Sequence, residues 1–271
     1  MLRGNNMPSV SNIAIGANMA AAAANKARHG MNESIARLST GVRAMYGADA
    51  AGHSMGKSMQ AVGASYAQAA RNIEDGISYA QMGESVLLEV ANLGSRLREL
   101  GISYDNAALL DANQEAALDA EAALIGDTIQ SIIDTTDFNT VEVVDSNTAT
   151  QKAIAYGSLT ANTTSVGPNV QIAVTNTIST ADAADTAADT LLASVAEGLG
   201  NIAADLTALK AFQGAASATG ANMAAAGARL IDTDFALETA NLTKNAILNQ
   251  AALAMAAQAN AAQSSILSVL Q

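Results

Sequence analysis

The chain has 271 residues, a formal net charge of −12, 50% hydrophobic residues, no cysteine, no tryptophan and only 3% aromatic residues. This acidic balance, without a cluster of lysines and arginines, argues against a nucleic-acid-binding protein. The missing cysteines exclude disulfides and thiolate metal sites, and no apolar run reaches the roughly eighteen residues of a membrane-spanning helix. Alanine supplies much of the apolar content, which favours long, closely packed helices over a large globular core.

The N-terminal segment is predicted to form a helix. Its stretch NIAIGANMAAAAA is similar to the apolar part of a signal peptide, but Asn12 and Asn18 interrupt it. The helical pattern also continues beyond it, so we expect residues 7–24 to stay in the working protein. Small or apolar residues recur there at spacings of four and three, as in a coiled-coil seam. The predicted seam positions are Ile13, Ala17, Ala20, Ala24, Ala27, Met31 and Leu38, with Ser34 as a polar exception.

The C-terminal segment repeats this pattern without a polar exception. Its predicted seam positions are Leu248, Ala252, Met255, Ala259, Ala262, Ile266 and Val269. One interpretation is that each end forms an ordinary amphipathic helix that docks on its own domain. Because the pattern occurs at both ends, we favour a second interpretation, in which the two helices pair with each other and with copies in neighbouring molecules.

Two more helices are predicted along the first half of the chain. Apolar residues from Val86 to Leu100 fall on one face of a long helix, and a shorter helix follows over about 113–133. Further along the chain, Asp182, Asp185 and Asp189 are spaced three and four apart, which could suggest a calcium site, but no EF-hand loop accompanies them. We interpret them as a solvated helix face.

A small β insert separates these helices from the returning one. After Asp134 the sequence becomes rich in Thr, Val, Ser and Asn, and alternation around 141–143 and 170–174 predicts a hairpin or two. Thr180 is typical of an N-cap, and an alanine-rich helix runs from there toward Arg229. The expected fold is mostly α: an elongated helical rod with coiled-coil helices at both termini and a small β-hairpin insert.

One catalytic motif occurs in the chain. The sequence GHSMG, 52–56, fits the G-x-S-x-G nucleophile elbow and would make Ser54 the nucleophile of an α/β-hydrolase. An elbow follows a buried strand, which the preceding residues do not predict, and its triad needs a histidine after the serine. Both histidines, His29 and His53, precede Ser54. We therefore expect no catalytic residue, no metal site and no cofactor.

Five separate blocks of the sequence match one known family. They are SIARLSTGVR at 34–43, ARNIEDGISYAQMGESVLLEV at 70–90, SRLREL at 95–100, TTDFN at 135–139, and RLIDTDFALETANLTKNAILNQAALAMAAQAN at 229–260 with ILSVL after it. In order and spacing they closely resemble bacterial flagellins, over roughly residues 9–144 and 228–271. The resemblance implies a structural subunit that polymerises into the helical flagellar filament, the propeller of bacterial motility, and not an enzyme.

The resemblance also implies a domain organisation. Residues 1–46 with 232–271 would form a discontinuous inner core that builds the filament tube. Residues 47–231 would form a helical rod with a small β/loop insert at about 138–179. The variable outer domains of the family are expected to be absent, which makes the chain similar to a short flagellin.

Partners and location follow only from the resemblance. They are further copies of the chain, the flagellar export apparatus with an export chaperone, and the filament cap and junction proteins, in a secreted extracellular filament. Some flagellins are recognised by a Toll-like receptor through residues that correspond to Arg96, Leu100 and Glu121. Assembly is the main role expected for these three, and no nucleic acid or membrane insertion is expected. Two alternatives stay open: the hook–filament junction protein, which resembles flagellin at both ends, and, remotely, a hydrolase.

Three departures from the family are visible. Flagellins usually start about where Met7 stands, which suggests that MLRGNN precedes the working protein. The stretch before the second long helix is shortened to MYGADA. The family's Phe-Asn-Gly is replaced here by Phe138-Asn139-Thr140.

Overall fold

The computed structural model describes residues 8–43, 49–146, 148–157, 162–172 and 180–270. Its contacts divide the chain into two compact units: a terminal unit, Met1–Gln60 with Ala224–Gln271, and a central unit, Ala61–Met223. This division falls inside two long helices, whereas the sequence analysis places the boundaries near residues 46 and 231.

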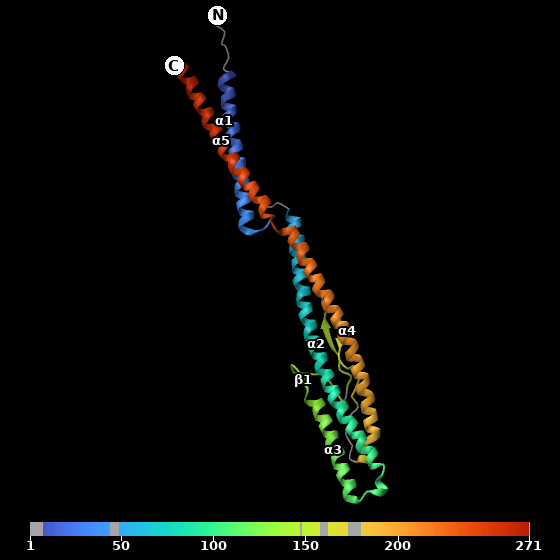
Figure 1. The fold of residues 1–271 in the computed structure, drawn as a ribbon. Helices are drawn as coiled ribbons and strands as arrows, with labels where there is room; N and C mark the ends of the chain where they lie inside the picture. Colours follow the sequence, from blue (N-terminus) through green and yellow to red (C-terminus); the bar gives the residue numbers. More distant parts are fainter. Residues whose placement is uncertain (1–7, 44–48, 147, 158–161, 173–179, 271) are drawn as a thin grey trace. The chain divides into compact units, whose positions relative to one another are not determined.

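In the terminal unit, the helices from the two ends of the chain lie side by side (Figure 1). They are α1, Pro8–Thr40, and α5, Phe235–Leu270. The start of α1 and the end of α5 lie at the same end of the pair, so the two helices are antiparallel. The unit also holds the first turns of α2, Ala50–Tyr104, and the last turns of α4, Ala184–Ile231. The predicted pairing of the terminal helices with each other is confirmed.

The central unit packs three helices around an apolar core. This unit contains the remaining turns of α2 and α4 together with α3, Ala112–Thr135. It also contains two short 3-10 helices, η1, Ala107–Leu109, and η2, Ala181–Ala183. The core draws side chains from all three long helices and from the β insert. Its largest fully buried members are Ile73, Leu87, Val90, Leu97, Ile129, Ile133, Val143, Val144, Val166, Ile172, Ile202 and Leu209. The mostly helical fold with a small β insert is therefore confirmed.

Capping explains where two of these helices begin. At the start of α3, the Asp111 carboxylate accepts backbone N–H groups of the first turn, and Gln114 Oε1 accepts the Asp111 N–H at 3.0 Å. This reciprocal arrangement is a capping box. Thr180, predicted as the cap of the returning helix, makes no side-chain cap bond. The Ala181 N–H, the first of this helical segment, donates to Asp119 Oδ1 of α3 at 2.6 Å, so a side chain distant in sequence satisfies it.

The β insert consists of two small antiparallel sheets. β1, Asp137–Phe138, pairs with β2, Val141–Glu142, and β3, Lys152–Ala155, pairs with β4, Thr163–Val166. The prediction of a hairpin or two in this segment is confirmed. Only two residues connect β1 to β2, so this turn must reverse the chain within the tightest hairpin loop.

The strand predicted over 170–174 is not present in the described part of this stretch. Val170 and Ile172 lie outside the strands, and Val174 lies outside the described residues. Ile172 is fully buried, and its N–H donates to the Asp145 carbonyl at 3.2 Å. The alternating apolar residues are therefore buried as single side chains against the helices and not as part of a strand. An alternating pattern alone cannot distinguish these two cases.

Candidate functional site on the terminal helix pair

The predicted seam on α1 faces α5. Ala24 and Ala27 are buried, and Ala17, Ala20, Met31 and Leu38 are half-buried. Ser34, the polar exception, is buried as well. The remaining position, Ile13, belongs to α1, but its side chain lies outside the described part of the structure. The described seam positions of α1 therefore lie on the buried side of this helix within one chain.

The face of α5 toward α1 differs from the predicted seam. Ala252 is buried and Ala259 half-buried as expected, but Leu248, Met255 and Ala262 are exposed. The side chains of Ile266 and Val269 lie outside the described part of the structure. The buried and half-buried row with alternating spacing is instead Glu238, Leu242, Asn245, Asn249, Ala252, Ala256, Ala259 and Gln263. Apolar periodicity missed this row because half of its members are polar, so only the matching spacing of the two asparagines could have indicated it.

Two polar contacts lie within the helix pair. Arg37 Nη1 donates to Glu238 Oε1 at 3.5 Å, and the Glu238 side chain is only 8% exposed. Asn245 packs against Gly30, where an added Cβ would lie 2.6 Å from Asn245 Nδ2. Glycine at this position therefore makes room for the asparagine. The fully buried part of the interface between α1 and α5 therefore consists of small and polar groups, and larger residues such as Met31, Leu38 and Leu242 are only half-buried.

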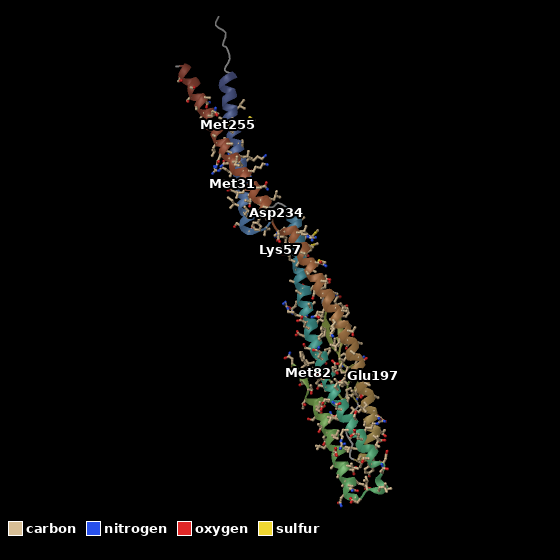
Figure 2. All side chains as sticks on the ribbon, in the orientation of Figure 1. Met31, Lys57, Met82, Glu197, Asp234 and Met255 are labelled. Atoms are coloured by element: carbon tan, nitrogen blue, oxygen red, sulfur yellow. The ribbon has the colours of Figure 1, made fainter. Side chains whose placement is uncertain are left out.

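The large apolar side chains of the pair point outward instead. Met255 on α5 is 61% exposed, whereas Met31 on α1 is half-buried (Figure 2). The exposed large apolar residues of the two helices, all at least 48% exposed, are Ile15, Met19, Ile35, Phe235, Leu237, Ile247, Leu248, Leu253 and Met255. In an ordinary core the large apolar residues are buried, whereas this helix pair buries alanine and exposes leucine and methionine. Such a surface is typical of an element that another protein covers.

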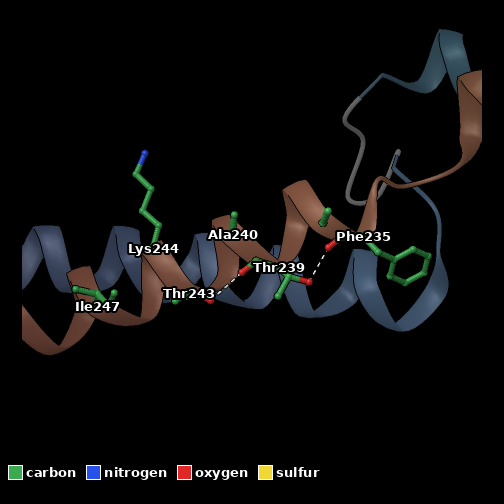
Figure 3. A pocket seen from close by; sticks show the side chains of 7 residues that line it. Phe235, Thr239, Ala240, Thr243, Lys244 and Ile247 are labelled. Atoms are coloured by element: carbon green, nitrogen blue, oxygen red, sulfur yellow. Dashed lines mark hydrogen bonds between the residues drawn. The ribbon is translucent and has the colours of Figure 1, made fainter.

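Part of this surface is a shallow groove along α5 (Figure 3). It is lined by Phe235, Ala236, Thr239, Ala240, Thr243, Lys244 and Ile247. The Thr239 hydroxyl donates to the Phe235 carbonyl at 2.6 Å, and the Thr243 hydroxyl donates to the Thr239 carbonyl at 2.9 Å. Because both hydroxyls are bonded within the helix, the groove offers mainly apolar contacts, with the Lys244 ammonium as its one cationic side chain.

The three residues for which the resemblance suggests a receptor role differ in exposure within the central unit. Arg96 donates to Glu121 Oε1 at 2.7 and 3.0 Å and to Glu99 Oε2 at 3.0 Å, and all three side chains are exposed. The hydrogen bonds with Glu121 and then Glu99 raise the pKa of Arg96. Leu100 is 3% exposed and packs with Leu97 in the core. The structure therefore brings Arg96 and Glu121 together at the surface and buries Leu100.

The GHSMG motif has a structural explanation. Ser54 lies near the start of α2, on a helix and not on the strand-to-helix turn of a nucleophile elbow. The Gly52 N–H donates to Asp49 Oδ1 at 3.0 Å, so this glycine lies beside the residue that precedes the helix. At Gly56 an added Cβ would lie 2.5 Å from Ile231 Cγ1 and 3.1 Å from the Gly227 carbonyl oxygen. The two glycines of the motif therefore serve a cap and a close helix crossing.

The described residues were also compared with what a metal site or a membrane-spanning helix requires. Within the described residues, no three His, Cys, Asp or Glu side chains come together as a group that could hold a metal ion. None of the described helices is long and apolar enough to cross a bilayer.

The two ends of the chain match known protein families. A profile of the bacterial flagellin N-terminal helical region matches residues 11–149, and one of the C-terminal helical region matches residues 182–270. The chain is similar to a flagellin of Halalkalibacterium halodurans, with 33% identity over 87% of this chain and 90% of that protein. It is similar to a flagellin of Bacillus subtilis, with 30% identity over 87% and 91%. A flagellar filament core protein of Brachyspira hyodysenteriae is 27% identical over 89% and 92%. The chain therefore belongs to the bacterial flagellin family.

Proposed function

We propose that this chain is a structural subunit that polymerises into the flagellar filament used in bacterial motility, with the outer faces of α1 and α5 as its main assembly surface. Membership of the flagellin family carries the role of subunit. The large apolar side chains exposed on the terminal pair support the choice of surface. Contacts between identical copies that do not close on themselves build an open helical polymer.

The composition of the helix pair couples its folding to assembly. Its fully buried residues are mainly alanine, with Ser34 and Glu238, and alanine buries far less apolar area than leucine does. Larger apolar residues such as Met31, Leu38 and Leu242 are only half-buried there. Ordering helices of 33 and 36 residues costs about 1–2 kcal/mol per residue in backbone entropy. We expect the pair to be marginal in a free subunit and to gain its stability when neighbouring copies cover Leu248, Met255 and the residues around them.

A paired substitution on α5 tests this surface. In Leu248→Gln/Met255→Gln, two exposed apolar side chains become polar while the face toward α1 is left unchanged. We expect the concentration needed for polymerisation to rise about tenfold or more, since each buried leucine or methionine contributes about 1.5–3 kcal/mol. Sedimentation and negative-stain imaging of purified full-length protein measure this.

A matched control is Leu109→Gln on η1, which also replaces an exposed leucine, 85% exposed, but in the central unit. Fibres should form from this variant as from the unchanged protein. If the double α5 variant polymerises at the unchanged concentration, the outer face of α5 is not an assembly surface. If the unchanged chain forms no fibres even when seeded, the hook–filament junction protein becomes the better interpretation.

The wider set of partners is proposed on the resemblance. Secretion through the flagellar export apparatus with a chaperone, and contacts with cap and junction proteins, follow from the family role. Recognition by a Toll-like receptor is a separate hypothesis, motivated by the exposed pair of Arg96 and Glu121. Because Leu100 is buried, binding there would rest on the charged pair, so Arg96→Ala should abolish the response. A receptor reporter assay in which micromolar unchanged protein stays silent would contradict the hypothesis.

A further inference from the structure

In the terminal unit, residues 41–43, which follow α1, lie against residues 231–233 at the end of α4. The first segment leads from α1 toward α2, and the second leads from α4 to α5. The Thr233 N–H donates to the Gly41 carbonyl at 2.9 Å, and the Arg43 N–H donates to the Ile231 carbonyl at 2.7 Å. An isolated antiparallel bridge lies between these two bonds. The backbone alone therefore ties the end of α1 to the end of α4.

The side chain of Arg43 extends this tie to a third helix end. Its Nη2 donates to the Leu230 carbonyl at 3.3 Å and to Asp49 Oδ2 at 2.5 Å. Leu230 belongs to the last turn of α4, whose carbonyls have no N–H partner within the helix. Asp49 directly precedes α2, and its other oxygen accepts the Gly52 N–H at 3.0 Å. One guanidinium thus connects the end of α4 with the residue that caps α2.

Both charges lie where the adjoining helix favours them. The C-terminal end of a helix carries partial negative charge and favours a cation, as Arg43 provides for α4. The N-terminal end carries partial positive charge and favours an anion, as Asp49 provides for α2. The side chains of Arg43 and Asp49 are about half exposed, at 51% and 48%, so the ion pair itself adds little to stability. Its main effect is on geometry.

We propose that Arg43 is a positioning residue that holds the α1–α5 pair in one orientation against the adjoining ends of α2 and α4 within the terminal unit. The consequence for a polymer rests on the proposed function: this junction sets how the terminal helices are presented to neighbouring copies. The GHSMG stretch takes part, since Gly52 lies where an added Cβ would clash with the Asp49 carboxylate.

Three variants of the full-length chain test the role of Arg43. Arg43→Ala removes both side-chain bonds, and Arg43→Lys keeps the charge but cannot reproduce the planar fork of the guanidinium. Asp49→Asn keeps an acceptor for the Gly52 N–H but removes the charge that faces Arg43. Arg28→Ala, which removes an exposed arginine of α1, is the matched control. Amide hydrogen exchange is measured in the state, soluble or polymerised, in which the amides of α1 and α5 are protected. Polymers are imaged by electron microscopy to compare their yield and curvature.

We expect Arg43→Ala to speed exchange at Gly52 and Thr233 about tenfold while the amides inside α1 and α5 keep their protection. Polymers should form in normal yield with altered curvature, Arg43→Lys should be intermediate, and adding Asp49→Asn to Arg43→Ala should cause no further loss. Exchange and curvature equal to those of Arg28→Ala would overturn the role of Arg43. Failure of the unchanged chain to polymerise would instead overturn the proposed function, and exchange in the soluble protein would still decide the role of Arg43.

Discussion

The two units of this chain use opposite kinds of residue in their interiors. The central unit buries leucine, isoleucine and valine completely, as Leu87 and Ile129 illustrate. The terminal pair buries alanine with Ser34 and Glu238, and leaves Leu248 and Met255 outside. Apolar burial contributes in proportion to area, so we expect the first arrangement to be the more stable of the two in a free subunit. The difference indicates that one unit folds on its own contacts and the other is completed by its neighbours.

The largest expected effect lies in the central core. Leu87→Ala should lower the free energy of unfolding by about 3 kcal/mol, because it removes a fully buried side chain and leaves a cavity. Its neighbour Leu88 is 50% exposed, so Leu88→Ala should cost less than about 1 kcal/mol. Urea unfolding followed by circular dichroism measures both. Equal costs for the two variants would contradict the view that the central unit depends on its apolar core.

The terminal pair should respond instead to its polar contact. Arg37→Met leaves the Glu238 carboxylate, 8% exposed, without its ion-pair partner on the other helix, and should cost about 2–3 kcal/mol in the polymer. Adding Glu238→Leu should restore most of this loss, because the unpaired buried charge is then gone. Thermal dissociation of polymers gives both values. If polymers of the double variant are no more stable than those of Arg37→Met, the Glu238 carboxylate is solvated without its partner. The ion pair with Arg37 would then not be a stabilising contact of the interface.

A smaller effect of opposite sign is expected in the β insert. Asn139 and Thr140 connect β1 to β2 with positive φ values of 51° and 64°. Asparagine tolerates this conformation, but a β-branched threonine does not. Thr140→Gly should therefore raise the stability of the central unit by about 1 kcal/mol. Asn139→Gly is the matched control and should gain less in the same thermal melt. A loss of stability in Thr140→Gly would show that the contacts of the threonine stabilise the unit by more than its positive φ costs.

The smallest effect concerns pH. Asp205 on α4 accepts the Gly167 N–H at 3.0 Å, and burial raises its pKa more than this bond lowers it. Since the folded pKa lies above the unfolded one, the charged form weakens the fold at neutral pH. This penalty disappears as the pH falls through the raised pKa.

Asp205→Asn keeps the acceptor for Gly167 and removes the charge. The variant should therefore melt slightly higher than the unchanged protein at neutral pH, and the gap should close in acid. Glu197→Gln, an exposed substitution on the same helix, should show no such dependence (Figure 2). A gap that widens in acid would mean that the carboxylate stabilises the fold.

Much of the fold could be predicted because local signals were strong. The helix that begins near Asn113 follows an Asp-x-x-Gln capping box at Asp111, and its start depends on neighbours in sequence alone. The buried face from Val86 to Leu100 follows from helical periodicity in the same way. The strand expected at 170–174 failed because burial of Ile172 produces the same alternation as a ladder.

The candidate site was only half predictable for a related reason. Periodicity finds apolar side chains, and on α1 these face the partner helix, as at Ala24 and Ala27. On α5 the inward row includes Asn245 and Asn249, whose burial depends on what α1 offers opposite them, such as Gly30. A single helix sequence carries no information about its partner's shape.

The sequence by itself determined the helices, the β insert, the flagellin family and the absence of thiol chemistry. These depend on composition, on short-range spacing and on the five stretches of sequence that match the family. Only the tertiary structure decided which residues lie between α1 and α5, that Arg96 pairs with Glu121 of α3, and that Arg43 connects two helix ends. Those facts involve groups far apart in the chain, such as Arg43 and Leu230. Their distances are set by how helices pack, and no local pattern in the sequence records that packing.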